Sequence, residues 1–359
     1  MNLIQTMMQQ AVDGGIFPGG VLLAAREGAV TCFVAAGRAN VFSGTMVTHD
    51  TLFDLASLTK PLATTLAVMK LVEQGVIEID QPMGSILPAL HHTGKQMITL
   101  RQLLAHTSGL PAYQPYYLRL CDFPADGRKA ALRQLLGNEP LIHPVGAFSL
   151  YSDIGFMLLE WVVETVSGQR LDRYVSDQIY RPLGLDHLFF IDLNRPRPVG
   201  RYAATEQCPW RKRVLEGEVH DDNAHAAGGI AGHAGLFGTA EDVFRLLDHL
   251  MGIYHQDIGS GIICPQLVRQ FFKRQPGTDR ALGFDTPSAT GSSAGEFFSR
   301  CSVGHLGFTG TSFWMDLERS VIVILLTNRV HPSRDNTRIS AFRPKVHNAV
   351  ITAMSGCRR

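Results

Sequence analysis

The residues best suited to chemistry in this chain are Ser57 and Lys60, which lie three positions apart. On a helix, residues at this spacing share a face, so the serine hydroxyl and the lysine ammonium can meet. A serine hydroxyl is a weak nucleophile until a neighbouring base takes its proton, and a desolvated lysine can be that base or hold another one in place. The pair therefore predicts acyl transfer. The competing interpretation is that Ser57 caps a helix and Lys60 is a solvated first-turn residue.

The segment that must position this pair has the pattern of a helix. Apolar residues recur along one helical stripe, and Gly75 is a natural C-terminal stop. Pro61 is tolerated in a first turn, which places the start of the helix near Ser57. A helix start brings the positive end of the dipole and free backbone N–H groups, and both favour a developing negative charge.

A nucleophile with its lysine still needs a proton shuttle, and Tyr151 is a candidate. It stands just before a predicted helix that begins at about Ile154. A tyrosine whose pKa is lowered by a nearby lysine can act as a base toward serine. The alternative is that Tyr151 packs its ring while Ser152 or Asp153 caps the helix, and the two interpretations are compatible.

The third candidate is the glycine-rich stretch 304–311, which contains His305. Glycines let a backbone approach a substrate closely, and a strand edge there could point an N–H group at a carbonyl oxygen. The alternative is a glycine-rich turn that carries one surface histidine.

The composition excludes several classes of partner. The chain has 359 residues, 45% of them hydrophobic, with 33 basic and 32 acidic side chains and a net charge of +1. Nucleic-acid and membrane-surface binding need a concentrated basic excess, which this balance does not give. No apolar run reaches the ~20 residues that span a bilayer. We expect a small-molecule or peptide partner, with no nucleic acid and no membrane, and the oligomeric state stays open.

The N-terminal residues 1–13 and the cysteines bear on location. Residues 1–13 have no basic region, long apolar run or cleavage site, so they predict an amphipathic helix rather than a secretory signal. The six cysteines show no C-x-x-C pair and no ligand-like spacing. We expect buried free thiols in a reducing cytoplasm, or a periplasmic location if a leader has been removed.

Strands are predicted at both ends of the chain. Residues 19–26 and 29–36 predict a hairpin covered on both faces, and residues 312–316 and 321–327 predict another. Helices are predicted at 100–105, 129–136, 154–166, 171–179, 240–251 and 345–354, with loop or short strands at 195–219. We expect an α/β (α+β) fold in which one antiparallel sheet is built from both termini and flanked by helices. In a single domain of residues 1–359, residues 1–80 and 235–359 form the α/β lobe, and residues 81–234 form an inserted, mostly helical lobe.

Taken together, the three candidate motifs resemble a known superfamily. Ser57-x-x-Lys60, Tyr151-x-Asp153 and His305-x-Gly307 resemble the Ser-x-x-Lys, Tyr-x-Asn and Lys/His-x-Gly motifs of class C β-lactamases and penicillin-binding proteins. Residues 103–110, 217–224 and 228–237 resemble the branch that holds D-alanyl-D-alanine carboxypeptidases, muropeptide hydrolases and family VIII esterases. The resemblance covers nearly the whole chain and implies a β-lactamase/transpeptidase-like fold.

The resemblance also implies roles for single residues. Ser57 would attack a carbonyl and form an acyl-enzyme, while Lys60 and Tyr151 would move its proton to the leaving group and then activate water. Backbone N–H groups of Ser57 and Phe308 would form the oxyanion hole. His305 would stand where other members have a lysine, either steering a substrate carboxylate or supporting Tyr151. The base stays open between Lys60 and Tyr151, whose titrations would be coupled.

Two positions depart from the superfamily pattern. Asp153 replaces the usual asparagine, and an ionised carboxylate cannot donate the hydrogen bond that an amide gives to a substrate carbonyl. Leu306 stands where threonine or serine is usual, although Gly307 is retained. Both changes weaken recognition of a β-lactam or an acyl-D-alanine substrate. We therefore expect a cofactor-independent serine hydrolase that acts on a small ester, amide or peptidoglycan-derived peptide.

Two rival functions use other features of the chain. One is a non-catalytic penicillin-binding or sensor protein that is acylated at Ser57 without turnover. The other is a metal hydrolase that uses a histidine and aspartate cluster, although its spacing matches no zinc motif, so no metal is expected. The members of that cluster are His220, Asp221, Asp222, His225 and His233. The resemblance places this segment along the cleft wall, and it makes His106 and Ser108 part of a hydrogen-bonded loop rather than a second catalytic pair.

Overall fold

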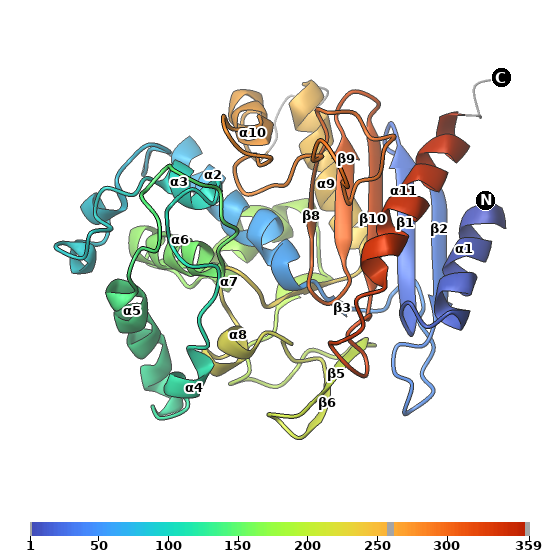
Figure 1. The fold of residues 1–359 in the computed structure, drawn as a ribbon, viewed down its shortest axis with the longest axis horizontal. Coiled ribbons are helices and arrows are strands. Elements are labelled where there is room, and N and C mark those ends of the chain that lie inside the picture. The colour runs from blue at the N-terminus through green and yellow to red at the C-terminus, as the bar shows by residue number, and fades with distance from the viewer. Residues whose placement is uncertain (1, 257–261, 356–359) are drawn as a thin grey trace.

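A five-stranded antiparallel sheet organises the fold (Figure 1). The computed structural model describes residues 2–256 and 262–355. The strand order is β2-β1-β10-β9-β8, so strands from the two ends of the chain pair at the centre of the sheet. The strands are β1 (Gly19–Arg26), β2 (Ala29–Gly37), β8 (Val303–Leu306), β9 (Ser312–Asp316) and β10 (Val321–Thr327). The predicted sheet built from both termini is confirmed.

The sheet has helices on both faces, and alternate residues of one strand point to opposite sides. Val323 of β10 packs with α1 (Asn2–Asp13) and α11 (Ile339–Ser355), while Ile324 belongs to the core that includes α2 (Leu66–Glu73) and α9 (Ala240–His255). This is the period of two expected of a strand buried on both faces. Helix α11 begins at Ile339, earlier than the predicted Lys345, and runs through Pro344.

The first hairpin corrects one prediction. Strand β1 is buried along almost its whole length, but the first three residues of β2 are exposed and only Cys32 and Ala36 are buried. Because β2 is the edge strand, it has one neighbour and incomplete cover. Glu27 and Gly28 both have positive φ, at 50° and 77°, as a tight two-residue hairpin requires.

Helices dominate the segment between the terminal strands. They include α3 (Leu100–Leu104), α4 (Tyr117–Leu120), α5 (Arg128–Asn138), α6 (Asp153–Ser167), α7 (Leu171–Val175) and α8 (Asp222–Ala226), and α10 (Pro265–Phe272) follows α9. Two small sheets accompany them, β3 (Phe53–Asp54) with β7 (Leu236–Gly238) and β4 (Leu188–Phe190), and β5 (Ala204–Cys208) with β6 (Arg213–Glu216). We propose that residues 81–234 form one lobe, and residues 1–80 with 235–359 the other, of a single domain.

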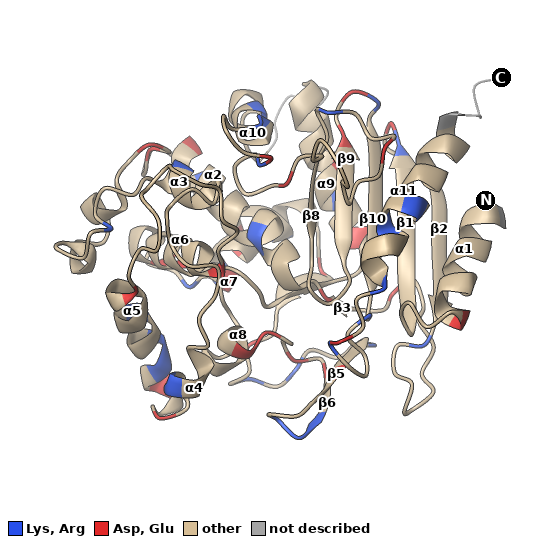
Figure 2. Cartoon of the chain, in the orientation of Figure 1, with Lys and Arg blue, Asp and Glu red and all other residues tan. Residues whose placement is uncertain are grey.

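The distribution of charged residues agrees with the sequence-based expectations, and the burial of the cysteines agrees with them only in part. Basic and acidic residues are interspersed over the elements (Figure 2), in keeping with the net charge of +1. Within the described residues, no helix combines the length and apolarity needed to cross a membrane. The described cysteines are free thiols, but the expectation that they are buried holds only for Cys32 and Cys208. The exposed ones are Cys121, Cys264 and Cys301, and Cys357 lies outside the described residues.

Candidate active site

Ser57 lies on a short turn directly after β3. The predicted helix starts here as a 3₁₀ turn, Ala56–Leu58, and continues through a wider π-helical turn, Lys60–Thr65, before α2. Ala56 has a φ of 48°, a left-handed conformation that is strained for a residue with a Cβ. The buried Asp54 carboxylate supports this turn by accepting the Ala56 N–H at 2.9 Å. The strained turn therefore presents the Ser57 hydroxyl at the end of a strand.

Lys60 is fully buried, and its ammonium is surrounded by oxygen atoms of other residues. Its Nζ lies 3.0 Å from Ser57 Oγ, 2.7 Å from Asp153 Oδ1 and 3.2 Å from the His233 carbonyl oxygen. Burial alone would lower the pKa of Lys60, but the charge of Asp153 and the Tyr151 phenol outweigh burial and raise it. Lys60 is therefore held in its charged form by Asp153. From the sequence, Asp153 was predicted only as a residue that faces the substrate, and this ion pair was not predicted.

The loop behind Lys60 is held by a second buried carboxylate. Glu160 of α6 accepts the Gly232 N–H at 3.0 Å and pairs with Lys129. A Cβ on Gly232 would lie 2.2 Å from the Phe156 carbonyl oxygen, so glycine is needed for this close approach. The same loop supplies the His233 carbonyl that Lys60 contacts. Glu160 was not predicted, because nothing in its local sequence separates it from an exposed helical glutamate.

Tyr151 packs over Lys60, with the ring centroid 4.7 Å from Nζ. Burial raises the pKa of the Tyr151 phenol above its ordinary value and outweighs the charge of Lys60 and the hydrogen bonds with Lys60 and Ser57, which act in the opposite direction. The expectation that Lys60 would lower this pKa overall is therefore wrong. The neighbouring Ser152 caps α6 by accepting the Gly155 N–H at 3.2 Å. The capping and catalytic interpretations of this stretch are therefore structurally compatible, as predicted.

His106 positions the Tyr151 loop. Its Nδ1 accepts the Ser152 N–H at 3.0 Å, and its ring lies 4.6 Å from the ring of Tyr151. It has a φ of 57°, and burial first, then nearby cations, hold its pKa well below the ordinary value. The prediction that His106 belongs to a hydrogen-bonded loop is confirmed.

His305 lies on β8, with the His305 and Tyr151 rings 6.0 Å apart. Its Nδ1–H donates to the Leu306 carbonyl at 2.9 Å, and its buried Nε2 has no partner in the described part of the chain. Burial, together with the cations Lys60 and Arg280, lowers the pKa of His305 to about 4 although Asp285 opposes this. His305 is therefore neutral near pH 7 and cannot replace the charge of a lysine.

Gly307 and Phe308 lie on the tight turn between β8 and β9. The Gly307 N–H donates to the Thr311 carbonyl at 2.7 Å. A Cβ on Gly307 would lie 1.9 Å from Thr311 Oγ1 and 2.7 Å from the Leu55 carbonyl oxygen. The Phe308 N–H has no intramolecular acceptor in the described part of the chain, so it is free to donate to a bound oxygen.

Hydroxyl groups tie this turn to the strand that carries Ser57. Thr309 Oγ1 donates to the Asp54 carbonyl at 2.7 Å, and Thr311 Oγ1 donates to the Leu55 carbonyl at 3.0 Å. The two backbone segments predicted to form an oxyanion hole are thus held against each other.

Two buried arginines clamp the same turn. Arg329 Nε donates to the Phe308 carbonyl at 2.8 Å, with its guanidinium 4.4 Å from the Phe308 ring. Arg343 Nη2 donates to the carbonyl groups of Gly307 and Thr311 at 3.2 and 3.0 Å. Neither arginine was predicted, because both are distant in sequence from the turn and carry no motif of their own.

Two cavities meet at Ser57 and Tyr151 and form the two arms of one cleft. The basic arm is a cavity of about 400 Å³ that the two residues share with His305, Gly307 and Phe308. Its charged lining consists of Arg280, Arg329, Arg343 and Asp285. The acidic arm, also about 400 Å³, is bordered by Ser57, Tyr151, Phe308 and Asp153. The rest of its lining includes Tyr113, His220, Asp221, Asp222, His233 and Arg334. Lys60 lies beneath the floor between the arms.

The histidines of the proposed metal cluster pair with separate carboxylates. His220 contacts Glu206 at 3.2 Å, and His233 contacts Asp221 at 2.9 Å. His225 lies 3.5 Å from a third carboxylate. Within residues 2–256 and 262–355, no three such side chains converge in the way that metal binding requires. As expected for a cleft wall, His220, Asp221, Asp222 and His233 border the acidic arm.

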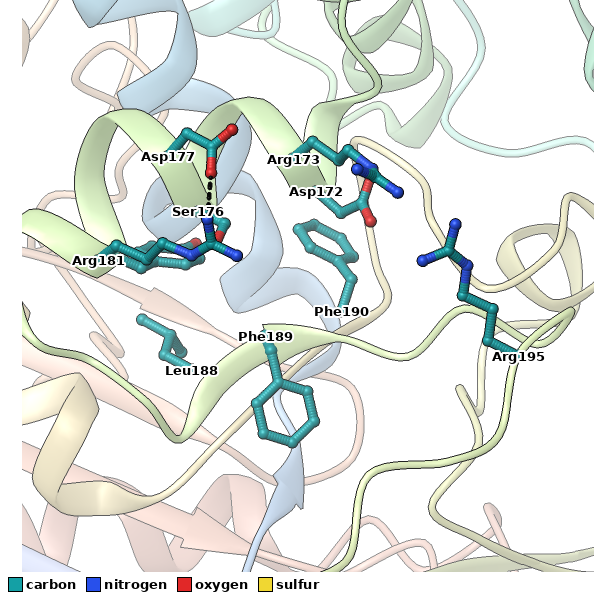
Figure 3. A pocket seen from close by; sticks show the side chains of 10 residues that line it. Asp172, Arg173, Ser176, Asp177, Arg181, Leu188, Phe189, Phe190 and Arg195 are labelled. Atoms are coloured by element: carbon teal, nitrogen blue, oxygen red, sulfur yellow. Dashed lines mark hydrogen bonds and ion pairs between the residues drawn. The ribbon is translucent and has the colours of Figure 1, made fainter.

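A separate cavity of about 320 Å³ lies between α7 and β4 (Figure 3). None of the predicted site residues borders it. Arg181 pairs with Asp177 at 2.9 Å across its lining, and Arg195 lies 3.5 Å from Asp192. The described lining contains one serine, Ser176, but no lysine or histidine, so it lacks the serine–lysine pair of the cleft at Ser57.

Comparisons with known proteins agree with this geometry. The family model described as Beta-lactamase matches residues 4–345. The chain is 31% identical to an N-acetylmuramyl-L-alanine amidase of Bacillus subtilis, covering 92% of this chain and 81% of the relative. It is 31% identical to a putative D-alanyl-D-alanine carboxypeptidase of Escherichia coli, with 92% and 82% covered.

Solved structures show the same fold. EstCE1, a hydrolase with promiscuous acyltransferase activity, has a TM-score of 0.77 at 24% identity, with 98% of each chain covered. The octameric penicillin-binding protein homologue from Pyrococcus abyssi has a TM-score of 0.75 at 20% identity, with 99% of this chain and 77% of that chain covered.

Proposed function

The chain belongs to the beta-lactamase family of serine hydrolases, and from this premise we propose that it cleaves small esters, amides or peptidoglycan-derived peptides through a Ser57 acyl-enzyme. The observation that carries the proposal is the 3.0 Å contact between Lys60 Nζ and Ser57 Oγ beneath the Tyr151 ring. A buried lysine and a tyrosine beside a serine on a strained turn form an activated-nucleophile arrangement.

In the acylation step, Ser57 Oγ forms a bond to the substrate carbonyl carbon. Its proton passes to whichever of Lys60 and Tyr151 is deprotonated, and that group then protonates the leaving oxygen or nitrogen as its bond to carbon breaks. Water attacks the acyl-enzyme in the second step, gives its proton to the same group, and the proton returns to Ser57 as the acid leaves. Lys60 and Tyr151 share this duty as a coupled pair.

The oxyanion that forms in each step would accept hydrogen bonds from the N–H groups of Ser57 and Phe308. The free Phe308 N–H and the ties between its turn and the strand before Ser57 support this assignment. Such donors are most effective when they are fixed before the reaction, because no reorganisation is then needed. Neutral His305 would support Tyr151 rather than attract a carboxylate by charge.

We propose that β-lactams are poor substrates. Asp153 offers an ion-paired carboxylate where an amide donor would bind the acyl carbonyl, and Leu306 offers no hydroxyl. We also propose a reducing, cytoplasmic location, which the free thiols support.

The test compares the wild-type protein with Ser57→Ala on p-nitrophenyl butyrate and nitrocefin, with intact mass measured for an acyl adduct. We expect turnover of the butyrate ester, a Ser57-dependent adduct and little nitrocefin cleavage. Near-normal ester turnover by Ser57→Ala would refute the mechanism. A stable penicillin adduct without turnover of esters, amides or cell-wall fragments would instead identify a binding or sensor protein.

A further inference from the structure

The carboxylate of Asp153 has bonding capacity that the protein does not use. Lys60 is its one partner among the described residues, at 2.7 Å from Oδ1. The side chain is 20% exposed and borders the acidic arm next to Ser57. An ionised carboxylate accepts about four hydrogen bonds, so Asp153 can take further donors from a molecule in the arm.

The rest of the acidic arm favours a cation. Asp221 accepts the Ala224 N–H at 2.7 Å and contacts His233, while Asp222 pairs with Arg211 at 2.9 Å. Arg334 is the one arginine in the described lining, and it donates to the Glu206 carboxylate through contacts of 2.5 and 2.8 Å. In Figure 2 an acidic residue marks α8, whose first residue, Asp222, borders this arm.

Tyr113 and His233, which also border the arm, further support binding of a cation. Burial raises the pKa of Tyr113, and the charges of Asp221, Asp222 and Asp153 raise it further, so the negative potential extends across the cavity. His233, which is 2% exposed, uses Nε2 for Asp221 and has a buried Nδ1 with no partner among the described residues. The arm thus combines negative charge with an unpaired polar atom in its wall.

We propose that the acidic arm binds a primary ammonium group on the acyl part of the substrate, with Asp153 as the residue that selects it. The inference rests on the proposed function, because it assigns the acyl group that Ser57 would accept. The substrate class is then an aminoacyl ester or amide with a free amine.

The chemistry of the side chain supports this selection. An asparagine at this position would donate a hydrogen bond to an acyl carbonyl, whereas a carboxylate can only accept, and an ammonium offers three donors and the complementary charge. An ammonium beside Asp153 would also share the carboxylate that now stabilises charged Lys60. Sharing it lowers the pKa of Lys60, so an aminoacyl substrate would help to generate the base that takes the proton of the attacking Ser57 hydroxyl.

The experiment compares two isosteric esters that differ by an ammonium in place of a methyl group. Alanine benzyl ester, as each enantiomer, and benzyl isobutyrate are given to the wild-type protein, to Asp153→Asn and to the exposed control Asp13→Asn, with benzyl alcohol release measured. Hydrolysis of p-nitrophenyl butyrate by the wild-type protein, compared with its absence in Ser57→Ala, tests the proposed function independently.

We expect kcat/KM for one alanine ester to exceed that for the isobutyrate by at least about tenfold, as one charge-assisted hydrogen bond provides. Asp153→Asn should remove this preference, so that the ratio of kcat/KM on the alanine ester to kcat/KM on the isobutyrate falls to about one whatever the absolute rates, while Asp13→Asn keeps the preference. In wild-type protein the preference should fade above about pH 8, where an α-amino group loses its proton.

Two outcomes would overturn the inference. One is Ser57-dependent turnover of p-nitrophenyl butyrate with neither alanine ester faster than the isobutyrate, which would leave the proposed function standing. The other is an alanine preference that survives in Asp153→Asn, which would place the ammonium elsewhere. Absence of turnover on every ester, amide and cell-wall fragment would defeat the proposed function itself.

Discussion

The two arms of the cleft share Ser57 and Tyr151 but use their charges differently. In the basic arm, Arg329 and Arg343 donate to backbone carbonyl groups and thereby hold the turn that carries Phe308. In the acidic arm, Asp153 holds the side chain of Lys60 and keeps free acceptor capacity. One arm therefore fixes the geometry of the backbone, and the other sets the protonation of the base and remains open to a ligand.

Tyr151 joins the two arms, so removing its hydroxyl should have the largest effect. Tyr151→Phe keeps the ring against Lys60 and loses only the proton-carrying oxygen. We expect kcat on p-nitrophenyl butyrate to fall by about 10²–10⁴-fold, the usual contribution of a general acid–base group. The matched control is Tyr254→Phe, and a Tyr151→Phe variant within twofold of wild type would remove Tyr151 from the mechanism.

The geometric role of the basic arm can be broken at Gly307. An added Cβ would meet Thr311 Oγ1 at 1.9 Å, so Gly307→Ala should displace the turn and the Phe308 N–H. We expect a loss of about 10²–10³-fold in kcat, as for removal of one oxyanion donor. Gly137→Ala is the control, since a Cβ there has no neighbour closer than 3.9 Å. Equal activity of the two variants would show that the turn does not serve the reaction.

The electrostatic role of the acidic arm can be tested by pH. Because Asp153 raises the pKa of Lys60, its neutralisation in Asp153→Asn should increase the uncharged fraction of Lys60 at neutral pH. The rise of kcat/KM with pH on p-nitrophenyl butyrate should move to lower pH, and nitrocefin acylation should increase severalfold. An unmoved profile would mean that Asp153 does not control the base.

The smallest predicted effect concerns the neutral ring in the basic arm. The pKa of His305 is lowered to about 4, so between pH 6.5 and 4 the unfolded chain binds a proton that the folded chain does not. The contribution of neutral His305 to the free energy of unfolding is present above pH 6.5 and is lost as the pH falls toward 4. From pH 7 to pH 5 this costs about 2 kcal/mol of unfolding free energy, which His305→Gln should spare in urea titrations. An identical pH dependence in the variant would show that folding does not lower the pKa of His305.

Local patterns predicted the strands of the second hairpin and the contact between Ser57 and Lys60. The second hairpin has the predicted strand bounds, and Ser57 and Lys60 meet as their spacing requires. The predictions that β2 is covered on both faces and that the last helix begins at Lys345 were wrong. The position of a strand at the edge of a sheet and the packing of a helix against that sheet depend on the assembled fold. The Lys60–Asp153 ion pair and the Arg329 and Arg343 contacts were missed for the same reason: spacing along one helix shows near neighbours, but not which distant side chains the topology brings together.

The hydroxyl ties of Thr309 and Thr311 join residues that are 255 and 256 positions apart in the chain. During synthesis, Ser57 and Lys60 leave the ribosome long before β8, β9 and β10 exist. The N-terminal strand β1 must wait for β10 as its neighbour, and long-range pairing of this kind is intrinsically slow. A nascent or truncated chain would carry its nucleophile without a formed oxyanion hole, so covalent labelling of Ser57 would report that the last strands have been added.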